Sequence, residues 1–186
     1  MSAPRPRAGA APAAVERLDR LLRLHAPTLA LLAAWTAMCG SLYWSEVRGL
    51  IPCGLCWYQR VLMYPLALLL PLGILRRDPG LHVYVLPFSL LGALVSGYHY
   101  LVQKTDLFSH AIACHVGVPC SAIYVHWLGF ITIPFQALTA FVIIFLAASA
   151  MRGGEWVAGA GPGRRSVAAA VGAVVAAFAL LARLAG

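Results

Sequence analysis

Residues 52–75, PCGLCWYQRVLMYPLALLLPLGIL, decide the class of fold. From residue 55 onward the run is almost entirely apolar, with Arg60 as its one charged residue. A helix needs about 20 apolar residues to cross the hydrocarbon core of a bilayer, because each residue rises about 1.5 Å. Residues 55–75 are therefore predicted to form a membrane-spanning helix, with two cysteines at its mouth.

The composition extends this prediction to the whole chain. Of the 186 residues, 61% are hydrophobic and only 11% are charged, whereas a soluble domain carries roughly 25% charged residues. Several segments contain prolines, which a helical bundle tolerates because neighbouring groups satisfy the freed backbone atoms. We expect an all-α integral membrane protein, a four-helix transmembrane bundle with a fifth C-terminal helix. The five predicted segments are 28–45, 55–75, 82–102, 127–150 and 166–184.

The basic residues indicate the orientation of these segments. Arginines cluster before the first segment, between the second and third, and after the fourth, whereas the alternate loops hold few cations. The positive-inside rule therefore places the N-terminus in the cytoplasm and both cysteine-bearing loops outside. The net charge of +8 does not indicate nucleic-acid binding, because the cations lie between apolar segments and not in a basic soluble module.

This topology divides the chain into four parts. Residues 1–27 are expected to form a basic cytoplasmic tail, and residues 28–150 the four-helix domain, with outer loops near 46–54 and 103–126. Residues 151–165 are a Gly-rich cytoplasmic linker. Residues 166–184 are expected to span the membrane; the alternative is a peripheral helix at the interface.

Four of the five cysteines form two pairs in the predicted outer loops, where disulfides form and persist. Cys53 and Cys56 have a two-residue spacer, and Cys114 and Cys120 lie in the second loop. A CxxC spacing is typical of a redox-active dithiol, but four cysteines can also bind zinc or form structural disulfides. Cys39 lies within the first segment and is expected to be a buried small hydrophobe.

The first pair has further features of a redox site. Pro52 is suited to the first position of a helix, which would place both cysteines in the N-terminal turns, where the dipole favours a thiolate. Arg60 lies one helical turn after Cys56, on the same face. An arginine at that depth needs a partner or water; a thiolate or the carbonyl oxygen of a bound acceptor would serve, and snorkelling to the interface is the alternative.

Three motifs together resemble the disulfide bond formation protein B (DsbB) family, especially its BdbC-like branch. They are PCGLCWYQRVLMYPL, YHYLVQK and GVPCSAIYVHWLGFITIPFQALTAF, in the same order as in that family. The resemblance covers residues 29–146, so the fifth segment lies outside it. It implies a membrane thiol oxidase in the bacterial cell membrane that reoxidises an extracytoplasmic DsbA-like thioredoxin-fold oxidase and passes electrons to membrane quinone, either ubiquinone or menaquinone.

The resemblance also implies roles for individual residues. Cys53 and Cys56 match the quinone-proximal pair, with Cys56 meeting the quinone, and Cys114 and Cys120 match the pair that exchanges with the partner. Arg60 matches the quinone-site arginine, and His99 resembles a polar position near the quinone. Cys114 and Cys120 stand closer in sequence than in the best-known member, so loop rearrangements described there are not carried over.

Two rival hypotheses remain at this stage. A vitamin K epoxide reductase-like protein also couples loop cysteines to quinone, but there the quinone-side CxxC comes last in the chain, whereas here it comes first. A metal-binding or purely structural membrane protein is the rival outside the enzymes. Our prediction is a protein-dithiol:quinone oxidoreductase with no metal ligands, whose partners are the thioredoxin-fold oxidase, membrane lipid and the quinone pool.

Overall fold

The computed structural model describes residues 13–105, 118–158 and 162–185. Within these ranges the chain is helical, and the strand-like pairing is limited to one bridge between Trp127 and Ile131. The elements are α1 (Ala13–Leu42), the π-helical turn η1 (Tyr43–Val47), α2 (Gly54–Arg76), α3 (Leu81–Lys104), α4 (Ile133–Ala150), the 3₁₀ turn η4 (Met151–Gly153), α5 (Glu155–Ala158) and α6 (Arg164–Ala185).

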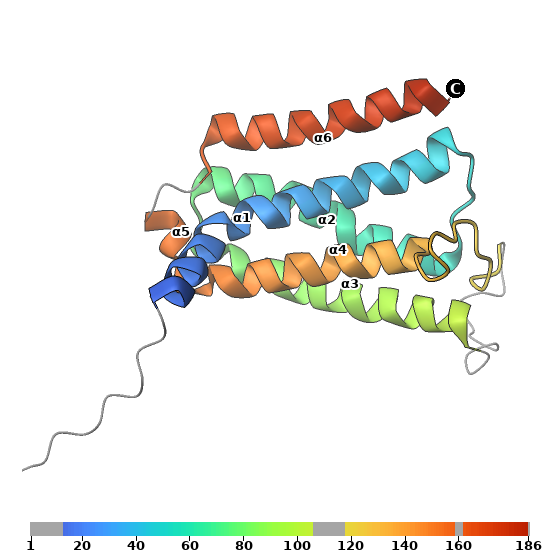
Figure 1. The fold of residues 1–186 in the computed structure, drawn as a ribbon, viewed down its shortest axis with the longest axis horizontal. Helices are drawn as coiled ribbons and strands as arrows, with labels where there is room; N and C mark the ends of the chain where they lie inside the picture. The colour runs from blue at the N-terminus through green and yellow to red at the C-terminus, as the bar shows by residue number, and fades with distance from the viewer. Residues whose placement is uncertain (1–12, 106–117, 159–161, 186) are drawn as a thin grey trace, which may run out of the picture.

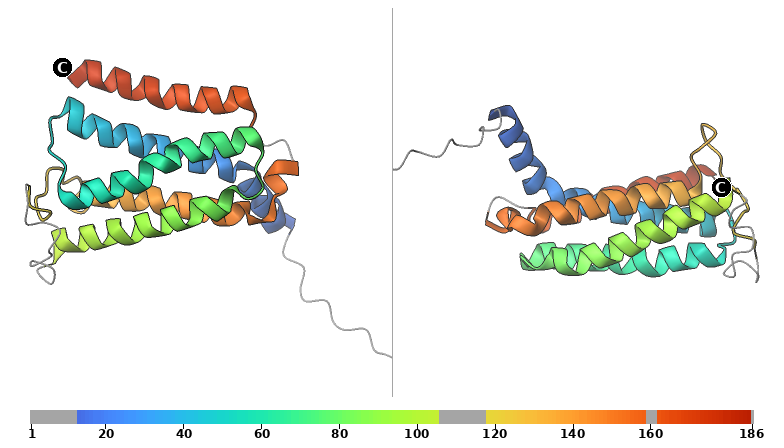
Figure 2. Two further views of the ribbon diagram at one scale, coloured as in Figure 1. Left: turned by 180° about the vertical axis from the view of Figure 1, so that it is seen from behind. Right: turned by 90° about the horizontal axis from the view of Figure 1, so that it is seen from below.

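The four helices α1 to α4 form a closed bundle. Contacts join α1 to α2, α2 to α3, α3 to α4 and α4 back to α1, and the helices lie side by side in Figures 1 and 2. The helix α6 lies outside this bundle along α1 and runs in the same direction (Figure 1). The start of α2 and the loop before α4 meet at one end of the bundle, and α5 lies at the other end (Figure 1).

Small residues allow the helices to approach closely. Ala26, Ala30 and Ala34 recur at one-turn intervals on α1 and are fully buried, as expected where backbones pack at short distance in a membrane. On α3, a Cβ atom added to Gly92 would collide with the ring of Phe141 from α4. This glycine is therefore required by the close crossing of α3 and α4.

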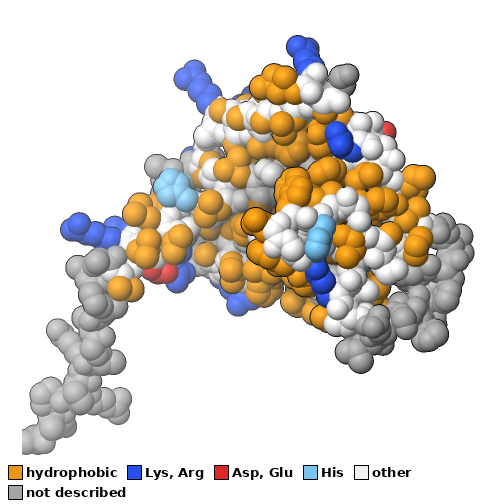
Figure 3. Space-filling model, turned by 45° about the vertical axis from the view of Figure 1, so that its right-hand side comes forward, with side chains coloured by type: hydrophobic (Ala, Val, Ile, Leu, Met, Phe, Trp, Pro, Cys, Tyr) orange, Lys and Arg blue, Asp and Glu red, His pale blue; other side chains and the backbone are white. Residues whose placement is uncertain are grey.

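The outside of the bundle is apolar. Leu68, Leu94 and Leu146 lie in three different helices and are each more than 60% exposed. Hydrophobic side chains are spread over the face drawn in Figure 3, and Lys and Arg side chains stand out singly. Five helices are long and apolar enough to cross a membrane. Such an exterior is suited to lipid, because the hydrophobic effect that buries leucine in water is absent there. The predicted fold class, an all-α integral membrane protein, is confirmed.

Two predicted helix starts differ from the structure. The second helix begins at Gly54 with Cys53 as its N-cap, so Pro52 precedes the helix and does not start it. The fourth begins at Ile133 and not at 127, because the chain reverses through the positive φ of Leu128 and Gly129. Pro134 consequently lies in the first turn of α4, where its missing N–H is harmless, and does not interrupt the helix.

The two flanking segments are also more helical than expected. The first helix already begins at Ala13, inside the predicted basic tail, and the predicted linker contains η4 and α5, where Trp156 is buried. Cys39 lies in α1, as predicted, and has a free thiol, but it is half-buried and not buried. A span that meets lipid on one side leaves such a side chain partly outside the protein core.

Candidate functional site

The N-terminus of α2 places two thiols side by side. Cys53 is the N-cap in an extended conformation and Cys56 lies in the first turn, where the N–H of Trp57 donates the first helical hydrogen bond to the carbonyl oxygen of Cys53. The Sγ atoms of Cys53 and Cys56 are 3.1 Å apart. A disulfide bond measures about 2.05 Å, so this pair is in the dithiol form, with both thiols reduced.

Cys120 brings the second pair to the first. It is disulfide-bonded and only 1% exposed, packed in a small cluster with Cys53, Leu55 and Val102. Its Sγ lies within 4.8 Å of the Sγ of Cys53. The predicted partner of Cys120, Cys114, lies outside the described residues.

The loop that carries Cys120 is held against the end of α3. The side-chain amide of Gln103 donates a hydrogen bond to the carbonyl oxygen of Ala122 at 3.0 Å. Lys104 donates another to the carbonyl oxygen of Gly129, also at 3.0 Å. These contacts fix the described part of the loop over the start of α2, which keeps the sulfur of Cys120 near that of Cys53.

His99 is buried between the two sulfur pairs. Its Nε2 lies 3.1 Å from the carbonyl oxygen of Cys120 and 3.7 Å from the Sγ of Cys53. Its Nδ1 lies 3.0 Å from the side-chain nitrogen of Gln59, which can only donate. Nδ1 therefore accepts, and the neutral ring carries its proton on Nε2, which points to the carbonyl oxygen of Cys120 and the sulfur of Cys53.

These contacts make Cys53 the acidic member of its pair. The hydrogen bond with Cys56 and, after it, the nearby His99 lower the pKa of the Cys53 thiol well below its usual range, against the opposing effect of burial. A thiolate is the nucleophile and the leaving group in disulfide exchange. The geometry therefore gives Cys53 the properties of the sulfur through which exchange proceeds.

The same three side chains have the spacing of a metal site. The ligand atoms of Cys53, His99 and Cys120 all lie within 4.8 Å of one another, and zinc is bound by thiolates and imidazoles. Cys120 is disulfide-bonded, however, and a disulfide sulfur is not a thiolate ligand. In this oxidation state the three residues suit sulfur exchange and do not form a zinc ligand set.

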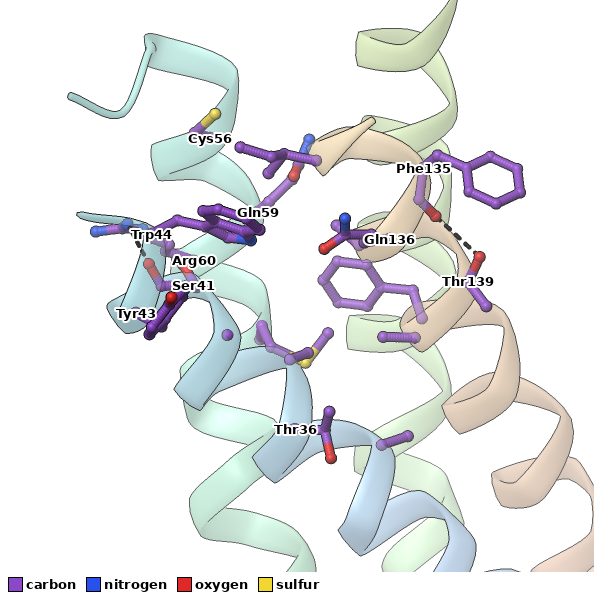
Figure 4. Close-up of a pocket in the computed structure, with 18 of the residues that line it drawn as sticks. Thr36, Ser41, Tyr43, Trp44, Cys56, Gln59, Arg60, Phe135, Gln136 and Thr139 are labelled. Atoms are coloured by element: carbon purple, nitrogen blue, oxygen red, sulfur yellow. Dashed lines mark hydrogen bonds between the residues drawn. The ribbon is translucent and has the colours of Figure 1, made fainter. Parts of the chain in front are cut away.

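A large apolar cavity begins beside Cys56. It has a volume of about 910 Å³ and is lined by residues of α1, α2, α4 and α6 and of the loop before α2. Figure 4 shows Cys56, Gln59 and Arg60 along one wall and Gln136 of α4 facing them. Cavities that bind small organic molecules have about this volume, an apolar lining and a few polar groups. This cavity therefore has the size and lining to bind a small, largely apolar molecule that carries a few polar groups.

Arg60 lies one turn below Cys56 at this cavity. Its Nη2 donates a hydrogen bond to the carbonyl oxygen of Ser41 at 3.1 Å (Figure 4), and its guanidinium carbon lies 5.2 Å from the ring centroid of Trp57. A guanidinium has five N–H donors, so the bond to Ser41 leaves donor capacity for a ligand. The side chain is held in place on the cavity wall by two protein contacts.

The structure thus brings together most of the predicted site. Cys53, Cys56 and Cys120 form one sulfur cluster, and Cys56 and Arg60 share the wall of the large cavity. His99 does not line that cavity; it lies beside Cys53 in a separate small cavity of about 20 Å³. The sequence reasoning missed Gln59, which follows Cys56 by three residues and so shares its helical face.

Comparisons with known proteins show what the chain is similar to. The family model described as "Disulfide bond formation protein DsbB" matches residues 23–151. "Disulfide bond formation protein C" of Bacillus subtilis is 50% identical over 127 residues, which are 66% of this chain and 92% of that protein. "Probable disulfide formation protein C" of Halalkalibacterium halodurans is 54% identical over 115 residues, 62% of this chain and 84% of that protein. No solved structure matches.

Proposed function

The chain belongs to the DsbB family of disulfide bond formation proteins, and from this premise we propose that it is a protein-dithiol:quinone oxidoreductase. As a member of that family it is a multi-pass membrane protein that generates disulfides. The proposal adds the electron acceptor, a membrane quinone, and the electron donor, a thioredoxin-fold oxidase outside the cytoplasm. One observation carries it: Cys53 lies between a sulfur of the second pair and Cys56, which borders an apolar cavity.

The first step is exchange with the partner. A thiolate of the reduced partner attacks the Cys114–Cys120 disulfide, Cys114 forms the mixed disulfide, and Cys120 leaves as a thiolate. The second thiol of the partner then displaces Cys114. The partner gains its disulfide, and Cys114 and Cys120 hold the two electrons as a dithiol.

The second step moves the electrons inward. The Cys120 thiolate attacks Cys53 of the oxidised Cys53–Cys56 pair, and Cys56 leaves as a thiolate. The sulfurs of Cys120 and Cys53 lie within 4.8 Å, so this attack needs only a small approach. Cys114 then displaces Cys53, which restores the Cys114–Cys120 disulfide. Cys53 is a good leaving group because its pKa is lowered.

The third step takes place at the large cavity. A quinone bound there supplies the oxidising power, accepting two electrons and two protons as the Cys53–Cys56 disulfide re-forms. Cys56 faces the cavity, and Arg60 is placed to stabilise negative charge on a ring oxygen. His99 positions and stabilises Cys53, and we propose this role for it because it lies at the sulfur and outside the cavity lining.

The orientation in the membrane is part of the proposal. The basic residues Arg76, Arg77 and Arg152 lie at the ends of α2 and α4, and the cysteines lie at the opposite end of the bundle. By the positive-inside rule the cysteine end faces outward, where the partner is found, and the N-terminus faces the cytoplasm. The membrane-soluble acceptor and the exported substrate then both reach the protein at the same end of the bundle.

The test is reduction of a short-chain quinone by the full-length protein, driven by a reduced thioredoxin-fold oxidase. We expect one quinone reduced for each partner disulfide formed, measured by quinone absorbance and by thiol counting. Cys53→Ser and Cys56→Ser should each abolish quinone reduction, because the acceptor-side disulfide cannot re-form. Cys114→Ser should stop reoxidation of the partner.

The matched control is Cys39→Ala, which removes a free thiol on α1 that lines neither the large nor the small cavity and should leave the rate unchanged. Partner oxidation without loss of quinone would contradict the proposed acceptor. Stoichiometric zinc in the purified protein, together with no quinone-dependent turnover, would contradict the redox assignment altogether.

A further inference from the structure

The helix α6 contacts the bundle through one narrow stripe. Its least exposed residues recur every three or four positions, as one face of a helix requires; they are Val167, Ala170, Val171, Val174, Phe178 and Ala182. Val167 is the buried one among them, and the rest are half-buried. Small side chains on this stripe let α6 lie close to α1, and the remaining faces are exposed.

Phe178 is the aromatic side chain of this stripe, and it meets one turn of α1. Its ring centroid lies 6.3 Å from that of Tyr43, and a Cβ atom added to Gly40 would lie 3.6 Å from its Cζ. Because Gly40 has no side chain, the aromatic ring rests directly over the α1 backbone at this level.

The same turn of α1 is the one that holds Arg60. The carbonyl oxygen of Ser41 accepts the hydrogen bond from Arg60, and Gly40 and Tyr43 on either side of it meet Phe178. Phe178 and Leu181 line the same cavity as Arg60. Phe178 therefore lies at the level of Arg60 in the cavity wall.

We propose that Phe178 sets which quinone ring the cavity accepts, by closing the wall between α1 and α6 at the level of Arg60. This inference rests on the proposed function and assigns the residue that decides acceptor fit. The selecting group is supplied by a helix outside the residues that match the family model, which end at 151. A flat, apolar ring gains contact area against the phenyl group, and a wider ring system has less room beside it.

The experiment measures initial rates for the full-length protein against two acceptors, a short-tailed ubiquinone and a short-tailed menaquinone. Phe178→Ala should raise KM for the ubiquinone about tenfold, the effect of losing part of one aromatic contact, and raise it less for the wider menaquinone ring. The rate at saturating acceptor should stay unchanged, because the sulfur relay is untouched. Phe178→Trp should narrow the cavity and raise KM for the menaquinone more than for the ubiquinone.

The two variants are expected to have opposite ring preferences, which would show that Phe178 acts through acceptor fit. A general loosening of α6 would instead raise both KM values alike in both variants, and that result would overturn the proposal. Leu184→Ala is the matched control, since Leu184 is 76% exposed on the same helix and does not line the cavity; its KM values should equal those of the unmodified protein.

Two negative results have different meanings. An unmodified protein that reduces neither quinone would refute the proposed function, and the inference with it. An unmodified protein that reduces both, with Phe178→Ala and Phe178→Trp matching its KM values, would refute the role of Phe178 and leave the proposed function standing.

Discussion

Cys53 combines a position at the start of a helix with three neighbouring groups. It is the N-cap of α2, it lies 3.1 Å from the sulfur of Cys56, and its other neighbours are His99 and Cys120. The helix N-terminus, Cys56 and His99 stabilise a thiolate, and Cys120 provides the exchange partner. A residue with these neighbours is both attacked and released in the proposed cycle, which is why its acidity matters more than that of a structural cysteine.

The acidity of Cys53 leads to a prediction at this scale. In the reduced protein, the alkylation rate of Cys53 by iodoacetamide should level off at a pH well below the usual range for a thiol, since the pKa of Cys53 is lowered and the thiolate dominates above it. An ordinary cysteine would keep gaining reactivity up to about pH 8.5. The measurement is mass spectrometry of the Cys53 peptide after timed labelling across the pH range.

The contribution of His99 can be separated in the same assay. His99→Asn keeps a polar side chain of similar reach but removes the imidazole, so the midpoint for Cys53 should move to higher pH. Reactivity of Cys39, which lies elsewhere on α1, should follow the same curve in both proteins. A midpoint that does not move would show that Cys56 alone sets the acidity of Cys53.

At the scale of the helices, one contact decides how closely α3 and α4 pack. Gly92→Ala should lower the free energy of unfolding by about 1 to 3 kcal/mol, the usual effect of overpacking a tight core, because the new methyl group would collide with the ring of Phe141. The melting temperature in detergent is the measurement. Combining Gly92→Ala with Phe141→Leu should recover part of the loss.

Gly97→Ala is the matched control on α3. A Cβ atom there would lie 4.0 Å from Leu138, an ordinary contact, so this substitution should change the melting temperature little. Equal losses for Gly92→Ala and Gly97→Ala would contradict the approach of Phe141 as the cause, since helix propensity alone favours alanine over glycine at both positions.

The helices themselves could be predicted from the sequence more readily than their ends. Long apolar runs identify the spans, because the bilayer imposes their length. The start of α4 could not be read in this way, since the residues 127–131 are as apolar as those that follow. The helix cannot begin at residue 127 because Leu128 and Gly129 have positive φ angles. Hydropathy carries no information on φ.

The candidate site could likewise be predicted in part, where its residues share one helix. The nearness of Cys56 and Arg60 could be predicted because it depends on spacing along one helix. The position of His99 at Cys53, and not at the large cavity, depends on how α3 packs against α2 and on the Cys120 loop. The contribution of Phe178 to the cavity depends on the packing of α6 against α1, so neither could be derived without the tertiary structure.

At the scale of the whole molecule, the direction of α6 makes a prediction about topology. The helix runs parallel to α1, so Ala185 lies at the end of the bundle that bears the cysteines, and Arg164 at the opposite end (Figure 1). In intact cells, a membrane-impermeant maleimide should label an Ala185→Cys variant and leave Arg164→Cys unlabelled until the membrane is opened. Labelling of both positions in intact cells would contradict a spanning α6.

The place of α6 in the chain has a consequence for how the protein is made. Chains fold from the N-terminus as they are synthesised, and α6 follows the four helices that form the closed bundle. The sulfur cluster is complete once α4 is in the membrane, whereas the cavity beside it gains Phe178 and Leu181 only when α6 has been inserted. Each new molecule is therefore expected to pass through a stage in which its sulfur cluster is assembled but the proposed acceptor cavity still lacks the wall that α6 supplies. Insertion of the final helix ends that stage.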